Sequence, residues 1–382
     1  MRFLVIGAGL QGSAAAFDLL RQPATKSVIV VDKDVTQAPA FLEPWRGKNL
    51  ELVRLDLNDE PAVRAQMARA DCVCCAAPYF FNAKLTQLAI EAGKHFCDLG
   101  GNTDIVFQQK AMHEQAVRKG VSVVPDCGVA PGMVNILAGE GIRRLDKAER
   151  VKIYVGGLPQ KPEPPLNYVV VYSLEGCLDY YTGRSWVLRD GKRAQVDALS
   201  ELEQVEFPPP WGTLEAFHTA GGISTMPFTW EGKVRTMEYK TLRYPGHAAI
   251  MKAIRDLGLI GDAPIDVDGT KVRPRSVFIA ATAPVLVKPH APDLIALQVE
   301  VTGTKDGKPA GTRWQLVDLF DAEHGVTAMM RTTGYSLAIT GSMQLDGRIP
   351  KPGVFAPDEI VPAAPMIAEL AKRGIALKET AL

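Results

Sequence analysis

Short apolar runs alternate with helix-like segments over the first 130 residues of the chain. Residues 2–6 are rich in strand-forming side chains, and residues 13–21 then carry Ala, Phe and Leu at helical spacings of three and four. Further apolar runs follow at residues 27–31, 50–55, 71–77, 94–99 and 121–125. Because these runs lack alternation, they indicate strands covered by helices on both faces. The pattern predicts a doubly wound parallel α/β sheet of the Rossmann type.

The pattern changes near residue 150. Residues 150–158 indicate a strand, and the four prolines of residues 159–165 cannot continue a regular sheet ladder. A hairpin is expected where residues 186–189 turn at Asp190-Gly191. Hairpins predict antiparallel strands, so this half of the chain differs from the first half, where a parallel sheet is expected.

A second hairpin is expected between residues 294–302 and 312–320, with its turn near residues 305–308. Polar and apolar residues partly alternate over its first arm, as in a sheet with one face covered by helices. We therefore expect an α+β domain here.

Helical spacing returns at residues 329–345 and again at 364–373, where Gly374 is the expected stop. We expect this tail to pack back onto the first domain. The predicted organisation is a Rossmann domain over residues 1–130, completed by residues 328–382, with an inserted α+β substrate and dimerisation domain over residues 131–327.

The composition is that of a globular protein without net charge. Hydrophobic residues make up 47% of the 382 residues and charged residues 23%. Because 43 basic side chains balance 43 acidic ones, no positive field attracts a nucleic acid or an acidic membrane surface. The start of the chain lacks the features of a signal peptide, and no apolar run approaches a membrane span of about twenty residues. We therefore expect a cytoplasmic protein that binds neither a nucleic acid nor a membrane.

The six cysteines do not form a disulfide framework. Cys72, Cys74 and Cys75 crowd one apolar run, and the others stand singly. None pairs with histidines at the spacing of a zinc finger. We expect reduced thiols that pack as small hydrophobic side chains, and no metal site.

A G-x-G-x-x-G motif, Gly7 to Gly12, lies between the first predicted strand and the first predicted helix. Its glycines allow a tight turn, close approach of the backbone to a pyrophosphate, and contact between helix and strand. Asp32 ends the next strand and would accept hydrogen bonds from the adenosine ribose, which favours NAD because a carboxylate repels the 2′-phosphate of NADP. The adjacent Lys33 leaves NADP open, and a glycine turn without a ligand is the alternative.

Two more sets of loops follow strand ends, where open α/β sheets bind their ligands. Residues 76–79 should pass the ribose and pyrophosphate, while residues 98–101 and 126–132 should flank the nicotinamide. Asp98 and Asp126 are candidate catalytic residues, although each could instead cap or order its loop. The predicted cofactor contacts are Gly7, Ala8, Gly9, Leu10, Gln11, Gly12, Asp32, Lys33, Asp56, Leu57, Ala76, Ala77, Pro78, Val129 and Ala130.

The second domain concentrates polar and titratable residues at 173–176, 215–222 and 238–247. The guanidinium of Arg243 matches the geometry of a carboxylate, although a surface position is the commoner fate of an arginine. His218 and His247 could move protons near neutral pH or satisfy hydrogen bonds in the core.

These stretches resemble a known family. The glycine motif and residues 98–101, 125–135, 155–159 and 241–246 are similar to the saccharopine dehydrogenase-like reductases, over essentially the whole chain. Within that family, the branch of lysine 6-dehydrogenases is the most similar over residues 172–182 (YSLEGCLDYYT), 214–225 (LEAFHTAGGIST) and 238–247 (EYKTLRYPGH).

The resemblance implies oxidative deamination of the ε-amino group of L-lysine by NAD, which gives ammonia and an aldehyde that cyclises to piperideine carboxylate. It also implies a homodimer. The substrate contacts carried over by motif position are Leu99, Gly100, Ser173, His218, Thr219, Thr241 and Arg243. Saccharopine reductases have an aspartate, within a D-P-G segment that touches the substrate, where this chain has Ala130.

Our hypothesis for the mechanism assigns the substrate carboxylate to Arg243 and the α-ammonium to Glu175. A base must take a proton from the ε-ammonium before hydride leaves, and His218 is the first candidate and Asp126 the second. One alternative is a saccharopine or related carboxy-amine reductase, with a larger substrate and NADP. Another is a catalytically silent NAD(P)-binding redox sensor.

Overall fold

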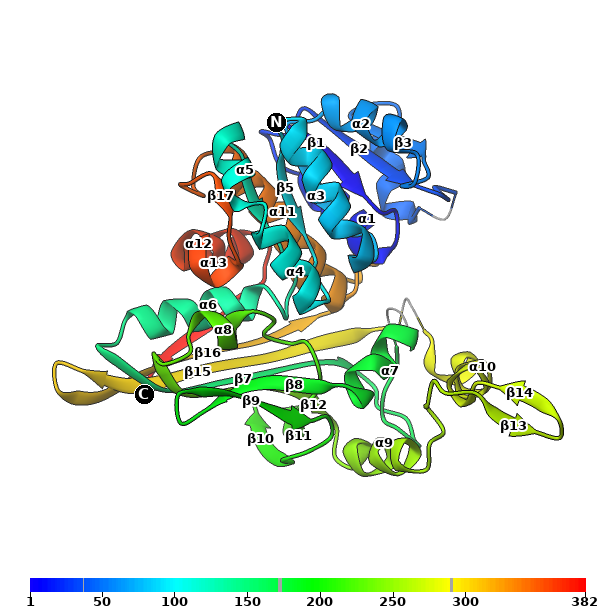
Figure 1. Cartoon of the computed structure of the whole chain (residues 1–382), viewed down its shortest axis with the longest axis vertical. Helices are drawn as coiled ribbons and strands as arrows, with labels where there is room; N and C mark the ends of the chain where they lie inside the picture. Colours follow the sequence, from blue (N-terminus) through cyan, green and yellow to red (C-terminus); the bar gives the residue numbers. More distant parts are fainter. Residues whose placement is uncertain (37, 171–173, 289–290) are drawn as a thin grey trace.

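The computed structural model describes residues 1–36, 38–170, 174–288 and 291–382, and it contains two large sheets (Figure 1). The first has the strand order β17-β6-β5-β4-β1-β2-β3, and all of its pairs are parallel. Its strands are β1 (Arg2–Ile6), β2 (Ser27–Asp32), β3 (Leu50–Arg54), β4 (Cys72–Cys75), β5 (His95–Asp98), β6 (Ser122–Val124) and β17 (Gly353–Val354). The predicted doubly wound α/β sheet is confirmed.

Helices cover both faces of this sheet, so its strands have buried side chains on each face. The helices and 3-10 turns of this half are α1 (Leu10–Leu20), η1 (Ala40–Trp45), α2 (Glu60–Ala68), η2 (Tyr79–Phe81), α3 (Asn82–Glu91), α4 (Thr103–Lys110) and α5 (His113–Lys119). The strand ends of β1, β4 and β5 meet at one edge, which brings their following loops together.

Most of the C-terminal segment returns to the first sheet, but its last strand, β18 (Lys378–Ala381), pairs with the second sheet, contrary to the prediction for residues 328–382. Helix α11 (Ala328–Leu345) packs against α1 and lies over β4 and β5, drawn in orange beside the blue strands in Figure 1. It is followed by α12 (Pro357–Ile360) and α13 (Ala363–Lys372). Arg373, after α13, donates to the buried Asp18 of α1 at 2.7 Å. This buried ion pair ties the tail to the first helix.

The second sheet has nine strands along the order β10-β11-β12-β7-β15-β16-β18, with β8 paired to β12 and β9 to β8. Only β7 and β12 run parallel to each other. Both predicted hairpins are present as β8–β9 and β15–β16. The strands are β7 (Lys147–Pro159), β8 (Arg184–Arg189), β9 (Lys192–Asp197), β10 (Glu203–Phe207), β11 (Gly212–Phe217), β12 (Val234–Arg243), β15 (Asp293–Lys305), β16 (Lys308–Leu319) and β18 (Lys378–Ala381).

Helices α6 (Met133–Arg143) and α8 (Met226–Thr229) lie on the face of this sheet that is turned toward the first one (Figure 1). One continuous core cluster contains Val5 of the first sheet, Leu137 of α6 and Val299 of the second sheet. The two sheets therefore share a core. The domain boundaries at residues 130 and 327 stay a prediction.

The remaining elements gather at one end of the second sheet (Figure 1). They are α7 (Leu174–Thr182), α9 (His247–Asp256), α10 (Pro274–Leu286) and the projecting hairpin β13 (Ile265–Val267) with β14 (Thr270–Val272). Among the described residues, no helix combines the length and the apolar character that crossing a bilayer requires.

Candidate active site

The glycine motif forms the tight turn between β1 and α1 that a dinucleotide needs. A side chain at Gly12 would place its Cβ 2.0 Å from the carbonyl oxygen of Gly7, so only glycine lets the helix approach the strand. A Cβ at Gly9 would meet nothing within 4 Å, so the backbone faces open space there. No side chain caps the start of α1, which leaves its first amides available to phosphate oxygens. These residues fit a bound dinucleotide.

Asp32 ends β2 beside this turn. Its Oδ2 accepts from the amide of Ala8 at 2.7 Å, and its Oδ1 accepts from the amide of Asp34 at 3.2 Å. These bonds fix the carboxylate at the edge where the adenosine ribose of a dinucleotide lies in this fold. Next to it, the exposed Lys33 pairs with Asp56 at 3.3 Å.

An open hollow next to this pair is lined by Lys33, Arg54, Leu55 and Asp56. Leu57, a predicted cofactor contact, packs instead against the core cluster on the second face of the sheet. Leu55 lines the hollow and is also a buried member of that cluster, so the packing of Leu57 does not exclude a contact with the cofactor, and this contact stays a prediction.

A cavity of about 220 Å³ lies between the strand ends of the first sheet and the second sheet. Seven of the predicted site residues line it: Gln11, Leu99, Val129, Ala130, Thr219, Thr241 and Arg243. The further lining residues are Gly101, Gly128, Pro131, Val155, Gly157, Tyr168, Val169, Tyr180, Ala220, Gly222, Tyr239, Met329 and Thr333. Its walls are therefore mainly apolar and aromatic.

Arg243 is the only charged side chain among the described lining residues. It is the last residue of β12 and is 5% exposed, with its guanidinium 4.3 Å above the ring of Tyr168 and one nitrogen donating to the carbonyl of Leu242 at 2.8 Å. Thr219 and Thr241 share a hydrogen bond of 2.7 Å on the same wall. Stacking holds the guanidinium plane in a defined orientation.

His247, a candidate proton carrier, lies behind this arginine and is buried. Its Nδ1 is 3.0 Å from the carbonyl oxygen of Leu166 and its Nε2 is 3.0 Å from the hydroxyl of Tyr181. Burial, followed by the positive charge of Arg243, lowers the pKa of His247 to about 3. This ring is neutral near physiological pH, and it supports the wall of the cavity.

His218 makes two hydrogen bonds that turn it away from the cavity. Its Nδ1 is 3.1 Å from the carbonyl oxygen of Tyr239, and its Nε2 is 3.1 Å from the carboxylate of Glu201. The ring is fully buried, and burial lowers its pKa. Both nitrogens already have partners, so the first candidate for the base does not reach the cavity.

The loop after β5 is organised by Asp98. Its Oδ1 accepts from the amide of Gly100 at 2.7 Å, and its Oδ2 accepts from the side-chain amide of Gln109 at 2.6 Å. Burial raises the pKa of Asp98 to about 6, against the effect of these donors. Asp98 thus orders the loop that carries the lining residues Leu99 and Gly101.

Asp126 is buried next to that loop. A Cβ at Gly100 would lie 1.7 Å from Asp126 Oδ1, so the carboxylate fills the space that the missing side chain leaves. Among the described residues, neither oxygen accepts a well-formed hydrogen bond, and the backbone of Asp126 has a φ of 62°. Burial raises its pKa to about 7, although the nearby Ser224 hydroxyl opposes part of that rise. Asp126 does not line the cavity itself, because its carboxylate lies behind the loop that contributes Leu99 and Gly101.

One predicted substrate contact lies elsewhere. Glu175, on α7, is half-exposed and pairs with Arg273 at 3.3 Å and with Arg275 at 3.8 Å, so it faces α10 and not the cavity. Ser173 lies outside the described residues. Ala76, Ala77 and Pro78 follow β4 next to the glycine turn, where a Cβ at Gly7 would lie 3.0 Å from the carbonyl oxygen of Ala76.

The sequence did not identify the aromatic wall. Tyr168, Tyr180 and Tyr239 come from three separate segments, and no spacing links them. Met329 and Thr333 also line the cavity, and the sequence offered a weak sign that they lie together, because residues four apart lie on the same face of a helix.

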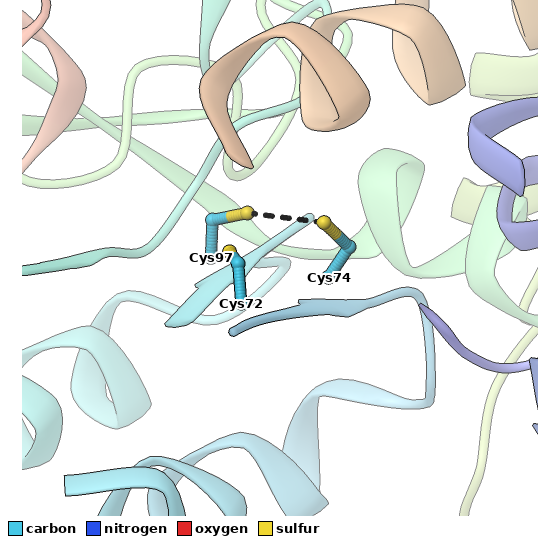
Figure 2. Close-up of side chains that lie close together, drawn as sticks. All are labelled: Cys72, Cys74 and Cys97. Carbon is cyan, nitrogen blue, oxygen red and sulfur yellow. Dashed lines mark hydrogen bonds between the residues drawn. The ribbon is translucent and has the colours of Figure 1, made fainter. Parts of the chain in front are cut away.

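Two clusters of metal-ligating atoms occur among the described residues. Figure 2 shows Cys72 and Cys74 of β4 with Cys97 of β5 beneath α11; their sulfurs lie within 4.8 Å of one another. A Cβ at Gly341 of α11 would come 2.7 Å from Cys74 Sγ, so the helix packs directly on the thiols. All six cysteines are buried and unbridged.

The other cluster joins Glu201, His218 and Glu238. A guanidinium already occupies it, because Arg189 pairs with both glutamates at 2.8 Å.

Two family models match the chain. The saccharopine dehydrogenase NADP binding domain matches residues 3–124, and the saccharopine dehydrogenase C-terminal domain matches residues 128–375. Saccharopine dehydrogenase [NADP(+), L-glutamate-forming] of Schizosaccharomyces pombe is 24% identical, with 98% of each chain covered. Alpha-aminoadipic semialdehyde synthase of Arabidopsis thaliana is 24% identical over 55% of this chain and 20% of its own.

A solved structure has the same fold. It is the apo histidine-tagged saccharopine dehydrogenase (L-Glu forming) from Saccharomyces cerevisiae, with a TM-score of 0.81 and 22% identity. The match covers 100% of this chain and 99% of that chain.

Proposed function

Because the chain belongs to the saccharopine dehydrogenase family, we propose that this oxidoreductase deaminates the ε-amino group of L-lysine with NAD. The products would be ammonia and an aldehyde that cyclises to piperideine carboxylate. The observation that carries the proposal is the cavity itself, a mainly apolar chamber beside the dinucleotide turn with Arg243 as its one described charged lining residue.

Arg243 would hold the substrate carboxylate. Its guanidinium is buried and oriented by Tyr168, and a planar guanidinium can donate two parallel hydrogen bonds to a carboxylate. The hydrocarbon chain of lysine would then lie along Val155, Met329 and the tyrosines. A bound nicotinamide supplies the hydride acceptor.

The ε-amine must lose a proton before its carbon can lose a hydride. Apolar walls and the positive charge of Arg243 disfavour an ammonium group in the cavity. We propose that Asp126 accepts this proton, because it is buried beside the lining residue Gly101 and its carboxylate is not tied to a donor of good geometry. After Asp126 has released that proton to solvent, its carboxylate would take a proton from the water that attacks the protonated imine. It would then return this proton to the nitrogen, which leaves as ammonia while the aldehyde forms.

We propose NAD as the cofactor within the nicotinamide class that the family uses. Asp32 presents a fixed carboxylate at the ribose edge, where a 2′-phosphate would be repelled. Lys33 pairs with Asp56 in the structure, and this pairing reduces its attraction for a phosphate.

A saccharopine-type substrate with NADP is the second candidate. The names of the fungal relatives favour it, and a second hollow of about 230 Å³ shares Gly101, Ala220 and Gly222 with the cavity. Arg184 and the start of α4 line that hollow, so it could take a further anionic arm.

The test is spectrophotometric. L-Lysine and saccharopine are each supplied with NAD and with NADP, and the reduced cofactor and free ammonia are measured. We expect NADH and ammonia from lysine at equal amounts. Cofactor reduction with saccharopine and NADP, and none with lysine, would overturn the proposal in favour of the second candidate. We also expect a homodimer, which light scattering during gel filtration would measure.

A further inference from the structure

The cavity has a cationic lining side chain that can bind an anionic group of the substrate, but it has no anionic lining side chain for an ammonium group. Arg243 is charged, and the described lining residues include no aspartate or glutamate. The undescribed residues add none, because none of them is acidic: they are Gln37, Val171, Tyr172, Ser173, Pro289 and His290.

The acidic residues next to the lining residues are engaged elsewhere. Glu215, opposite Arg243 on β11, accepts from the amides at the start of α9 at 3.0 and 2.5 Å. Glu238 pairs with Arg189 at 2.8 Å, on the face of β12 away from the cavity. Glu175 pairs with arginines of α10. None of these carboxylates is available to an ammonium group in the cavity.

Asp179 pairs with Arg275 at 2.5 Å, and Asp104 lines only the adjoining hollow. Asp98 and Asp126 both lie behind the loop after β5, where Asp98 already accepts from Gly100 and Gln109. The Asp126 oxygen occupies the space over Gly100, while Gly101 is the loop residue that lines the cavity. That position suits one amine at the end of the substrate near the dinucleotide turn. It leaves the α-ammonium of lysine, which is bonded to the carbon that carries the carboxylate, next to Arg243.

An α-ammonium next to Arg243 meets a like charge in a mainly apolar space. The ring faces of the tyrosines attract a cation, but they do so without fixing its position or its stereochemistry. The carboxylate, in contrast, meets a directional donor. The site therefore distinguishes substrates by the carboxylate and by the distance from it to the amine.

We infer that the substrate class is the ω-amino carboxylic acids in general, and that the α-amino group and its configuration are not required. This inference rests on the proposed function and deepens it. 6-Aminohexanoate, which is lysine without its α-amino group, should be oxidised with a kcat/KM within tenfold of that of L-lysine or above it, and D-lysine should behave likewise. 1,5-Diaminopentane, which lacks the carboxylate, should be at least about a hundredfold poorer, because Arg243 would lose its partner.

The experiment measures NADH formation by the full chain with these four amines. Calorimetric titration of the chain in the presence of NADH supplies a readout that does not depend on turnover: hexanoate should bind and compete with lysine, and pentylamine should not. In Arg243→Met the kcat/KM for 6-aminohexanoate, divided by the kcat/KM for 1,5-diaminopentane, should fall to near one. The matched control is Arg235→Met, at the opposite end of β12, where the arginine is exposed and pairs with Asp190; it should keep the native ratio.

The outcomes distinguish a failure of this inference from a failure of the proposed function. If lysine is oxidised but 6-aminohexanoate and D-lysine are more than tenfold slower, the proposed function stands and this inference is wrong. If no amine yields NADH, the proposed function fails, and equal affinities for lysine and 6-aminohexanoate in the titration would still support the inference. Should Arg243→Met fail to fold, the panel on the native chain decides.

Discussion

Replacing Asp126 by asparagine removes a buried carboxylate and keeps the shape of the side chain. Asparagine also tolerates the positive φ of 62° at this position. The carboxyl group has a raised pKa in the folded state, so the folded chain binds a proton that the unfolded chain has released. Asp126 therefore destabilises the folded chain most at high pH, and its removal should raise the free energy of unfolding most at high pH.

The magnitude follows from the ordinary pKa of 3.8 and the folded value of about 7. The unfavourable contribution is roughly 2 kcal/mol at pH 5 and roughly 4 kcal/mol at pH 8, since each pKa unit is worth about 1.4 kcal/mol. Asp126→Asn should thus gain on the order of 2–3 kcal/mol more stability at pH 8 than at pH 5. Urea unfolding at the two pH values measures this difference.

The same variant tests the proton acceptor. We expect kcat/KM for lysine to fall by about 10²–10⁴. In the native enzyme kcat/KM should rise with pH through about 7, as the Asp126 carboxyl deprotonates and its pKa is passed, and the variant should lack this rise.

The matched control is Asp190→Asn, an exposed aspartate that also has a positive φ. It should change stability by less than about 1 kcal/mol at either pH, because an exposed ion pair contributes little. Equal stability changes at pH 5 and pH 8 in Asp126→Asn would refute the argument from burial. An unchanged kcat/KM would remove Asp126 from its role.

Three further predictions concern the first sheet. Asp32→Ala should raise the KM for NAD at least about tenfold and narrow the preference over NADP, measured by initial rates with both cofactors. Gly9→Ala should leave the melting temperature unchanged, because its Cβ meets no protein atom, but it should weaken the NADH affinity measured by fluorescence titration, because that open space is where the dinucleotide would lie. Gly12→Ala should lower both the melting temperature and the NADH affinity. Gly341→Ala should lower the stability by about 1–3 kcal/mol in urea unfolding, because its Cβ would press on Cys74.

The sequence identified the first sheet well because its signals are local. Six of the seven parallel strands lie in the apolar runs that predicted them, and the glycine motif has a fixed spacing to Asp32. The seventh, β17, is only two residues long and was not predicted. The hairpins β8–β9 and β15–β16 were predictable for the same reason, since their turns are marked by Asp-Gly pairs. The last strand, β18, was not, because its partner β16 is more than fifty residues away and its exposed side chains carry no apolar pattern.

The site was predicted less completely, because a residue type does not reveal which way the side chain points. His218 has the chemistry of a base, yet both its nitrogens bond to Tyr239 and Glu201. Glu175 has the charge to meet an ammonium, yet it pairs with Arg273 on a helix about a hundred residues later. Arg243 was predictable from its motif, whereas the tyrosines around it became neighbours only through the pairing of distant strands.

In the proposed reaction the terminal amine of the substrate is oxidised in the cavity beside the dinucleotide turn, where Arg243 holds the substrate carboxylate. The yield of NADH and of ammonia from L-lysine, in the native chain and in Arg243→Met, tests this proposal. We expect equimolar NADH and ammonia from the native chain and a kcat/KM at least about a hundredfold lower in the variant. Native turnover that Arg243→Met leaves unchanged, or an absence of lysine-dependent NADH from the native chain, would contradict it.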